Sequence, residues 1–143
     1  MLTHTPDRDR AVARFSKLGE HGALWLALAG VGAAFRPERR SAFMRAAATV
    51  LIAYGVNQAI KYTVRRARPA DQLAATVSQL SYPSAHAATS VAGARSLAGL
   101  LPAAPLGALA AAVALSRLYL GVHYPSDVVA GCALGAAVAE LRR

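Results

Sequence analysis

The chain has 143 residues, 55% of them hydrophobic, and a formal net charge of +9. This length leaves little room for a second domain, and the apolar content exceeds what a soluble core of this size usually buries. The arginines punctuate apolar stretches and are not interleaved with aromatic residues on one polar face. The charge therefore disfavours a nucleic-acid partner and favours a membrane protein with basic ends.

The first predicted element is a basic amphipathic helix within residues 1–20. Thr5 and Pro6 suit the cap and the first helical position, and apolar side chains recur on one face from Ala11 to Leu18. We interpret this helix as lying on a bilayer surface among membrane lipids. An ordinary solvated amphipathic helix is the alternative.

Five apolar stretches follow, and residues 21–143 are expected to form a helical bundle. The stretches lie between Glu20 and Arg36, between Arg45 and Lys61, and over residues 87–101, 103–120 and 128–139. Each is shorter than the roughly 20 residues of a full span, but five in succession predict an all-α, multi-pass transmembrane bundle. Gly131 and Gly135 have the G-x-x-x-G spacing that permits close helix contact, either inside the bundle or in a dimer. The oligomeric state stays open.

If all five stretches cross the cell membrane, the unusual polar residues gather on one face. The links at residues 36–40 and 101–105 and the tail Arg142–Arg143 lie on the opposite face. The site face holds the N-terminal helix, residues 61–86 and residues 116–127. Basic residues are balanced between the two faces, so the positive-inside rule does not decide which of them is cytoplasmic.

A basic cluster, KYTVRRARP, begins where the second apolar stretch ends. Lys61 and Arg68 are candidate ligands for an anion. Arg65 and Arg66 are interpreted as a solvated basic flank at a membrane edge.

A second cluster, YPSAH, precedes the third apolar stretch. Ser84 suits the N-cap of a helix whose free backbone N–H groups, at Ala85 and His86, would point outward and attract an anion. A plain N-cap without a ligand is the alternative. The tripeptide YPS recurs at residues 124–126, and we expect similar helix-start chemistry at both places.

The third cluster, SRLYLGVHYPSD, contains Arg117, His123 and Asp127. A carboxylate beside a histidine fixes the tautomer of the ring and leaves the other nitrogen as a base or nucleophile. Together with Lys61 and Arg68, these residues predict a trap for a phosphate-like oxyanion beside a nucleophile.

Two other hydrolytic chemistries are disfavoured. The chain has no H-E-x-x-H motif and no carboxylate cluster, so we expect neither a metal nor another cofactor. A triad of Ser84 or Ser116 with His123 and Asp127 is conceivable, but the G-x-S-x-G elbow is absent.

The ordered clusters resemble the three-part signature of the type 2 phosphatidic acid phosphatase superfamily, which includes vanadium haloperoxidases. The matching residues are Lys61-x6-Arg68-Pro69, Pro83-Ser84-Ala85-His86 and Ser116-Arg117-x5-His123-x3-Asp127. The resemblance implies a phosphoric monoester hydrolase that needs no metal, with residues 1–143 as one integral-membrane phosphatase domain. Vanadate-dependent peroxidase chemistry is disfavoured because those relatives are large and soluble.

The resemblance also implies a role for each residue. His123 would attack phosphorus to give a phosphohistidine, Asp127 would orient it, and His86 would protonate the departing alkoxide. The phosphoryl oxygens would be held by Lys61, Arg68, Ser84, Ala85 and Arg117. The family usually has glycine where this chain has Ala85, and alanine is comfortable there if the residue opens a helix.

The expected substrate has a lipid or prenyl tail in the membrane and a phosphate at the interface. Leu73, Val77 and Leu80 recur at helical spacing and are predicted to form an apolar lip. The short alanine-rich chain and the SYPSAHAATS segment resemble small actinobacterial members that act on decaprenylphosphoryl-phosphoribose. Phosphatidylglycerol phosphate, phosphatidic acid and undecaprenyl pyrophosphate are alternative substrates, and a non-catalytic anionic-lipid-binding protein is an alternative function.

Overall fold

The computed structural model describes residues 4–142, and within this range it contains helices and no strand. The helices are α1 (Pro6–Lys17), η1 (Glu20–Gly22), α2 (Ala23–Phe35), η2 (Pro37–Arg39), α3 (Arg40–Val64), α4 (Ala85–Leu97), α5 (Ala103–Tyr119) and α6 (Pro125–Leu141). The prediction of an all-α fold is confirmed. Helices α2 to α6 occupy the five apolar stretches, and α1 occupies the predicted amphipathic segment.

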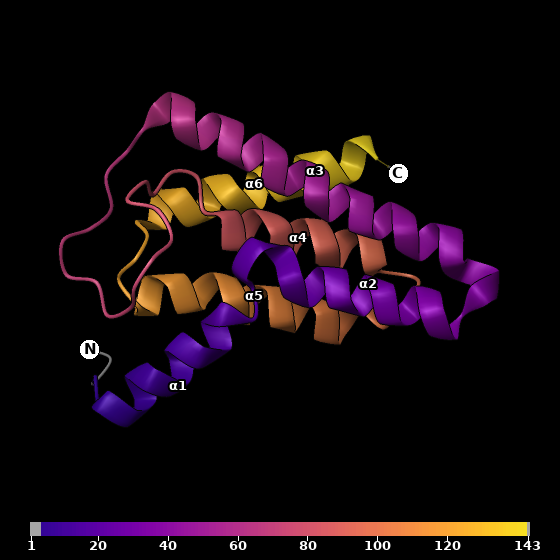
Figure 1. The fold of residues 1–143 in the computed structure, drawn as a ribbon, viewed down its shortest axis with the longest axis horizontal. Helices are drawn as coiled ribbons and strands as arrows, with labels where there is room; N and C mark the ends of the chain where they lie inside the picture. Colours follow the sequence, from indigo (N-terminus) through magenta and orange to yellow (C-terminus); the bar gives the residue numbers. More distant parts are fainter. Residues whose placement is uncertain (1–3, 143) are drawn as a thin grey trace.

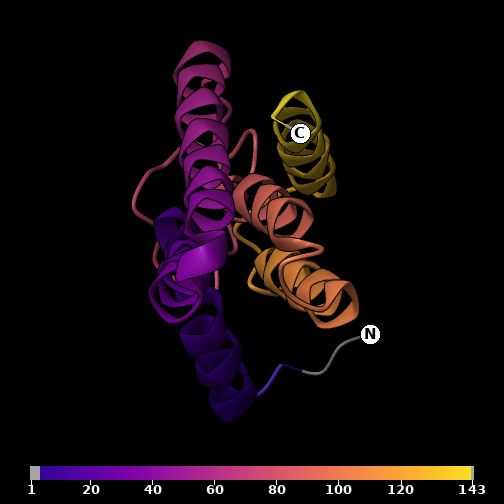
Figure 2. The same ribbon diagram turned by 90° about the vertical axis from the view of Figure 1, so that its right-hand side faces the viewer.

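Helix α4 lies in the middle of the bundle, with α3, α5 and α6 around it (Figure 2). This position requires small side chains, because neighbouring helices must approach its backbone closely. The Trp25 ring packs where a side chain at Gly93 would stand, and its indole N–H donates to Ser90 Oγ at 3.0 Å. The Ala, Gly and Ser content of this helix therefore fits its central place.

Helix α6 packs directly against the backbone of α4. A Cβ atom at Gly131 would collide with the carbonyl oxygen of Ser84, and one at Gly135 would collide with the carbonyl oxygen of Ala88. The G-x-x-x-G spacing thus serves packing inside the bundle, the first of the two uses predicted for it.

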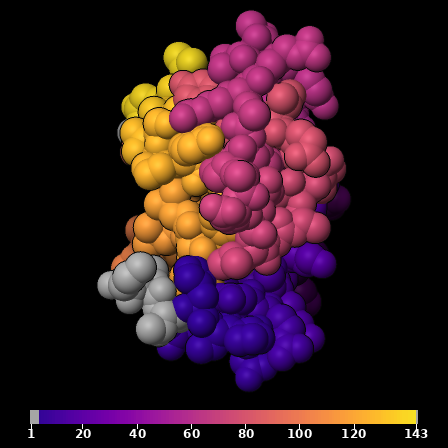
Figure 3. All heavy atoms as spheres, turned by 90° about the vertical axis from the view of Figure 1, so that its left-hand side faces the viewer, coloured from indigo at the N-terminus to yellow at the C-terminus, as the bar shows by residue number. Residues whose placement is uncertain are grey.

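The connections between helices divide between two ends of the molecule, as predicted (Figure 1). At one end, Arg36 donates to the carbonyl oxygen of Leu100 at 3.2 Å and Arg39 to that of Gly99 at 3.4 Å. The other end gathers α1, the loop at residues 65–84 and the loop at 120–124, and the first of these loops covers much of its surface (Figure 3). Of the predicted C-terminal tail, Arg143 lies outside the described residues.

The loop between α3 and α4 differs from the prediction made for its apolar residues. Leu73, Val77 and Leu80 do not lie on a helix, because the segment folds back on itself through an antiparallel bridge between Ala67 and Leu80. Val77 is 75% exposed at the end of the bundle. The helical spacing of these apolar residues does not indicate a helix, because backbone hydrogen bonds to residues distant in sequence, such as that from Leu73 to Leu120, hold the segment in another conformation.

By length and hydropathy, no single helix within residues 4–142 suffices to cross a membrane. One bent pair, Pro6–Lys17 with Glu20–Phe35, meets both criteria together across a 41° bend. The count of five spans and the surface position of α1 stay predictions.

Candidate active site

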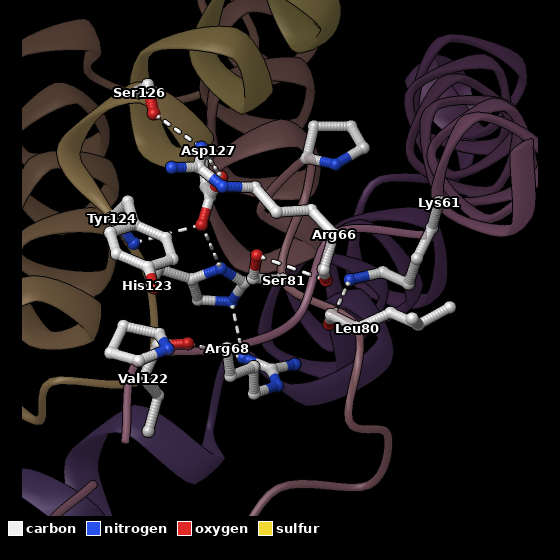
Figure 4. Close-up of polar contacts among 12 residues, drawn as sticks. Lys61, Arg66, Arg68, Leu80, Ser81, Val122, His123, Tyr124, Ser126 and Asp127 are labelled. Carbon is white, nitrogen blue, oxygen red and sulfur yellow. Dashed lines mark hydrogen bonds and ion pairs between the residues drawn. The ribbon is translucent and has the colours of Figure 1, made fainter. Parts of the chain in front are cut away.

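His123 and Asp127 form the centre of the candidate site (Figure 4). Asp127 is the third residue of α6, where its Oδ2 accepts the backbone N–H of Tyr124 at 2.9 Å and so caps the helix. The same oxygen lies 3.6 Å from His123 Nδ1, and both side chains are buried. A carboxylate facing Nδ1 favours a proton on that nitrogen and leaves Nε2 unprotonated.

Arg66 corrects the interpretation made from the sequence. Its guanidinium donates to Asp127 Oδ1 at 2.9 Å and to Ser126 Oγ at 2.8 Å, and lies 4.0 Å above the Tyr124 ring. It balances the charge of a carboxylate that is fully buried, which a solvated flank would not do. Arg65 is exposed, as predicted, and ends α3 in a left-handed conformation with φ 54°.

Arg68 lies on the other side of the His123 ring. Its guanidinium approaches Nε2 to 3.1 Å and also donates to the carbonyl oxygens of Val122 at 2.6 Å and Ser78 at 2.7 Å. Burial, followed by the charge of Arg68, lowers the pKa of His123 to about 2. The imidazole is therefore neutral at physiological pH, the state that a nucleophilic nitrogen requires.

A cavity of about 350 Å³ opens beside His123. Six of the predicted site residues line it: Lys61, Arg68, Ala85, His86, Arg117 and His123. Lys61 is buried, and its ammonium donates to the carbonyl oxygen of Leu80 at 3.0 Å. Asp127 and Ser84 are fully buried and do not line the cavity. Three cations that converge on one cavity create a strongly anion-attracting site.

The start of α4 forms one edge of this cavity. Ser84 takes the N-cap position, as predicted, but its hydroxyl makes no cap bond and has no partner within residues 4–142. Ala85 is the first helical residue and has no positive φ, so alanine fits without strain at the place where the family has glycine. His86 Nε2 donates to the carbonyl oxygen of Ser16 at 3.1 Å.

Ser16, at the end of α1, is a site residue that the sequence did not reveal. It is buried, and its hydroxyl accepts hydrogen bonds from Arg117 at 2.5 Å and from Ser116 at 2.9 Å. With the bond from His86 to its carbonyl oxygen, Ser16 holds two residues of the candidate site. Its position depends on the docking of α1 against α5, which no local pattern encodes.

Comparison with known proteins assigns the family. The model of the PAP2 superfamily matches residues 42–142, which include all three clusters. The chain belongs to the PAP2 superfamily. Two curated relatives are named decaprenylphosphoryl-5-phosphoribose phosphatase. The one from Mycobacterium tuberculosis is 47% identical over 92% of this chain and 77% of its own. The one from Mycolicibacterium smegmatis is 43% identical over 85% of this chain and 68% of its own.

Two solved structures share the fold. The transmembrane PAP2 type phosphatidylglycerolphosphate phosphatase of Bacillus subtilis superposes with a TM-score of 0.81, over 97% of this chain and 76% of that one, at 24% identity. Aquifex aeolicus LpxE superposes with a TM-score of 0.80, over 98% of this chain and 87% of that one, at 23% identity. At this level of identity, the similarity shows that the fold is shared and does not identify a substrate.

Proposed function

We propose that this PAP2 protein is a membrane phosphatase that removes the phosphomonoester of decaprenylphosphoryl-5-phosphoribose or a closely similar prenyl-linked phospho-sugar. The observation that carries the proposal is the neutral His123, held between Asp127 and Arg68 at the edge of a cationic cavity. The names of relatives at 43% and 47% identity support the choice of substrate.

The proposed reaction has two steps. His123 Nε2 attacks phosphorus, the bond from phosphorus to the ribose oxygen breaks, and His86 donates a proton to that oxygen. Water then gives a proton to His86 and attacks the phosphohistidine, which releases inorganic phosphate and restores His123. Asp127 stabilises the imidazolium character that develops when Nε2 forms its bond to phosphorus.

The transferring phosphoryl group gathers negative charge on its oxygens, and the cavity supplies the matching donors. Lys61, Arg68, Arg117 and the backbone N–H of Ala85 are proposed to bind these oxygens from the wall of the cavity. The buried Ser84 hydroxyl, directly before Ala85 and without a partner within residues 4–142, is proposed as a further donor. Phosphoryl transfer depends chiefly on such positioning and charge stabilisation.

We further propose that residues 1–143 form one membrane domain in which α2 to α6 cross the bilayer and α1 lies along its surface. The fold shared with a transmembrane PAP2 phosphatase supports this arrangement. The site end of the bundle would then meet the lipid head groups, where the phosphate of a prenyl-anchored substrate lies.

Release of phosphate from a panel of lipid phosphates, measured in EDTA, tests the proposal. The panel includes decaprenylphosphoryl-5-phosphoribose, phosphatidylglycerol phosphate, phosphatidic acid and undecaprenyl pyrophosphate. We expect the ribose substrate to be hydrolysed fastest and the His123→Ala variant to lose more than the roughly 10²–10⁴-fold typical of a missing acid or base. Binding of these lipids without turnover would instead identify a non-catalytic protein, and a His123→Ala variant with normal activity would refute the mechanism.

A further inference from the structure

The wall of the cavity formed by α3 is polar, although the helix is largely apolar elsewhere. Tyr54, Gln58, Lys61 and Tyr62 all line the cavity. Residues separated by three, four, seven or eight positions lie on one face of a helix, so these side chains form a continuous polar stripe. Lys61 belongs to the phosphate end of this stripe, whereas Tyr54 and Gln58 lie a turn or more away from it.

Tyr54 and Gln58 take part in a chain of hydrogen bonds that reaches the start of α2. The Gln58 amide donates to the Tyr54 hydroxyl at 2.8 Å, and this hydroxyl shares a hydrogen bond with His21 Nδ1, also at 2.8 Å. Gln58 Oε1 is buried and accepts no hydrogen bond from any residue between 4 and 142. A buried acceptor without a partner is costly, so it marks a place where a donor from a ligand fits.

The backbone of His21 adds an independent observation. His21 has φ 52° and ψ 17°, in the left-handed region that residues other than glycine rarely adopt. This unfavourable conformation places the ring against Tyr54 at the cavity. Strain of this kind persists where it is held by surrounding structure, and it concentrates at ligand sites.

The size of the cavity leaves room beyond a phosphate. Its volume of about 350 Å³ is more than ten times the roughly 30 Å³ that one water occupies in the liquid, and lies in the range of small-molecule sites. Arg68, Arg117 and His123 account for the phosphate end. The remaining space is bounded by the polar stripe and by the loop at residues 74–78.

We propose that His21, Tyr54 and Gln58 form a hydroxyl-binding subsite that recognises the sugar between the scissile phosphate and the prenyl chain. A sugar hydroxyl can donate to Gln58 Oε1 and accept from a neighbouring donor, whereas an acyl or prenyl group attached directly to phosphate offers no donor there. The inference rests on the proposed function and deepens it, because it assigns the choice of head group to three residues outside the signature clusters.

The test compares two substrates that both present a phosphate monoester but differ in whether a sugar carries it. One is a short-chain prenylphosphoryl-5-phosphoribose, and the other is a prenyl monophosphate without sugar, both presented in detergent. We expect Gln58→Leu and Tyr54→Phe each to lower the ratio of kcat/KM for the first substrate to that for the second by about five- to fiftyfold, the effect of losing a hydrogen bond and leaving its partner unsatisfied. The Tyr54→Phe change removes one oxygen atom and so guards against a folding defect in the other variant.

Thr63→Val is the matched control. Thr63 is an exposed residue of α3 whose hydroxyl bonds to the carbonyl oxygen of Ala59, and it does not line the cavity. We expect this variant to keep the wild-type ratio. A ratio that stays at the wild-type value in both variants, whether or not kcat/KM itself falls, would overturn the proposed subsite. A wild-type protein that hydrolyses neither substrate would instead overturn the proposed function, so the two failures are distinguishable.

Discussion

The two YPS tripeptides have the same letters but build different structures. At the first, the helix begins after the serine: Ser84 is the N-cap residue of α4, is fully buried, and has a hydroxyl without a partner among the described residues. At the second, the helix begins at the proline: Tyr124 is the N-cap residue of α6, and Ser126 is exposed and bonds to Arg66. The expectation of similar helix-start chemistry at both places is wrong.

The residue three positions after the tyrosine explains the difference. Asp127 reaches back to the backbone N–H of Tyr124 and so fixes the helix start at Pro125. The equivalent position after Tyr82 is Ala85, whose methyl group cannot cap a helix. The two turns are nevertheless joined, because the Ser84 N–H donates to the carbonyl oxygen of Asp127 at 2.9 Å. A tripeptide therefore does not set helix register; the side chain beyond it does.

Asp127→Asn, at the second of the two turns, is expected to cause the largest loss of activity. The amide cannot hold His123 in the reactive tautomer and leaves Arg66 without the charge that it balances. We expect kcat to fall by about 10³–10⁴-fold, as for the carboxylate of other histidine-carboxylate pairs. Steady-state phosphate release measures the loss, and circular dichroism checks that the overall helix content is kept. A loss below tenfold in a folded variant would show that the second turn does not orient the nucleophile.

The matched pair Ser84→Ala and Ser126→Ala gives the next largest effect. Ser84 is proposed to bind a phosphoryl oxygen, so its loss should lower kcat/KM by about 10- to 100-fold. Ser126 is exposed and accepts a hydrogen bond from Arg66, which keeps its bond to Asp127 without it, so the loss of Ser126 should cost less than about threefold. Similar losses in the two variants would contradict the different roles assigned to the two serines.

The smallest effect concerns stability and pH. The folded-state pKa of His123 is about 2, below the ordinary value of 6.5, so the neutral ring stabilises the fold above pH 6.5 and this contribution is lost as the pH falls. When the pH falls from 7 to 5, we expect the free energy of unfolding to decrease by on the order of 1–2 kcal/mol more in the wild type than in His123→Gln, because glutamine does not titrate. Thermal unfolding in detergent at both pH values measures the difference. Parallel declines would show that the ring is not held neutral.

The sequence predicted the helices because each apolar stretch is bounded by charged residues, histidine, glycine or proline. It misjudged their ends where charged residues continue a helix: α3 begins at Arg40, five residues before the predicted boundary at Arg45. Arg45 itself is exposed on that helix. Hydropathy reports burial and does not report where backbone hydrogen bonds stop.

The sequence also predicted which clusters meet at one end of the bundle, but not every residue that serves them. Arg66 and Arg68 stand two positions apart in a basic run that follows the left-handed turn at Arg65. Arg66 faces Asp127, whereas Arg68 faces His123. No composition rule separates two arginines in this way, because the separation arises from tertiary structure.

The hydrogen bond between Ser16 and Arg117 joins residues 101 positions apart. During synthesis α1 emerges early, yet it must wait for α5 before it can hold the residues around the cavity. Loop closure over such a distance is slow compared with the formation of single helices. The contacts of Ser16 at the candidate site therefore cannot form until α5 has been made, so the growing chain completes this site only when most of the bundle is present.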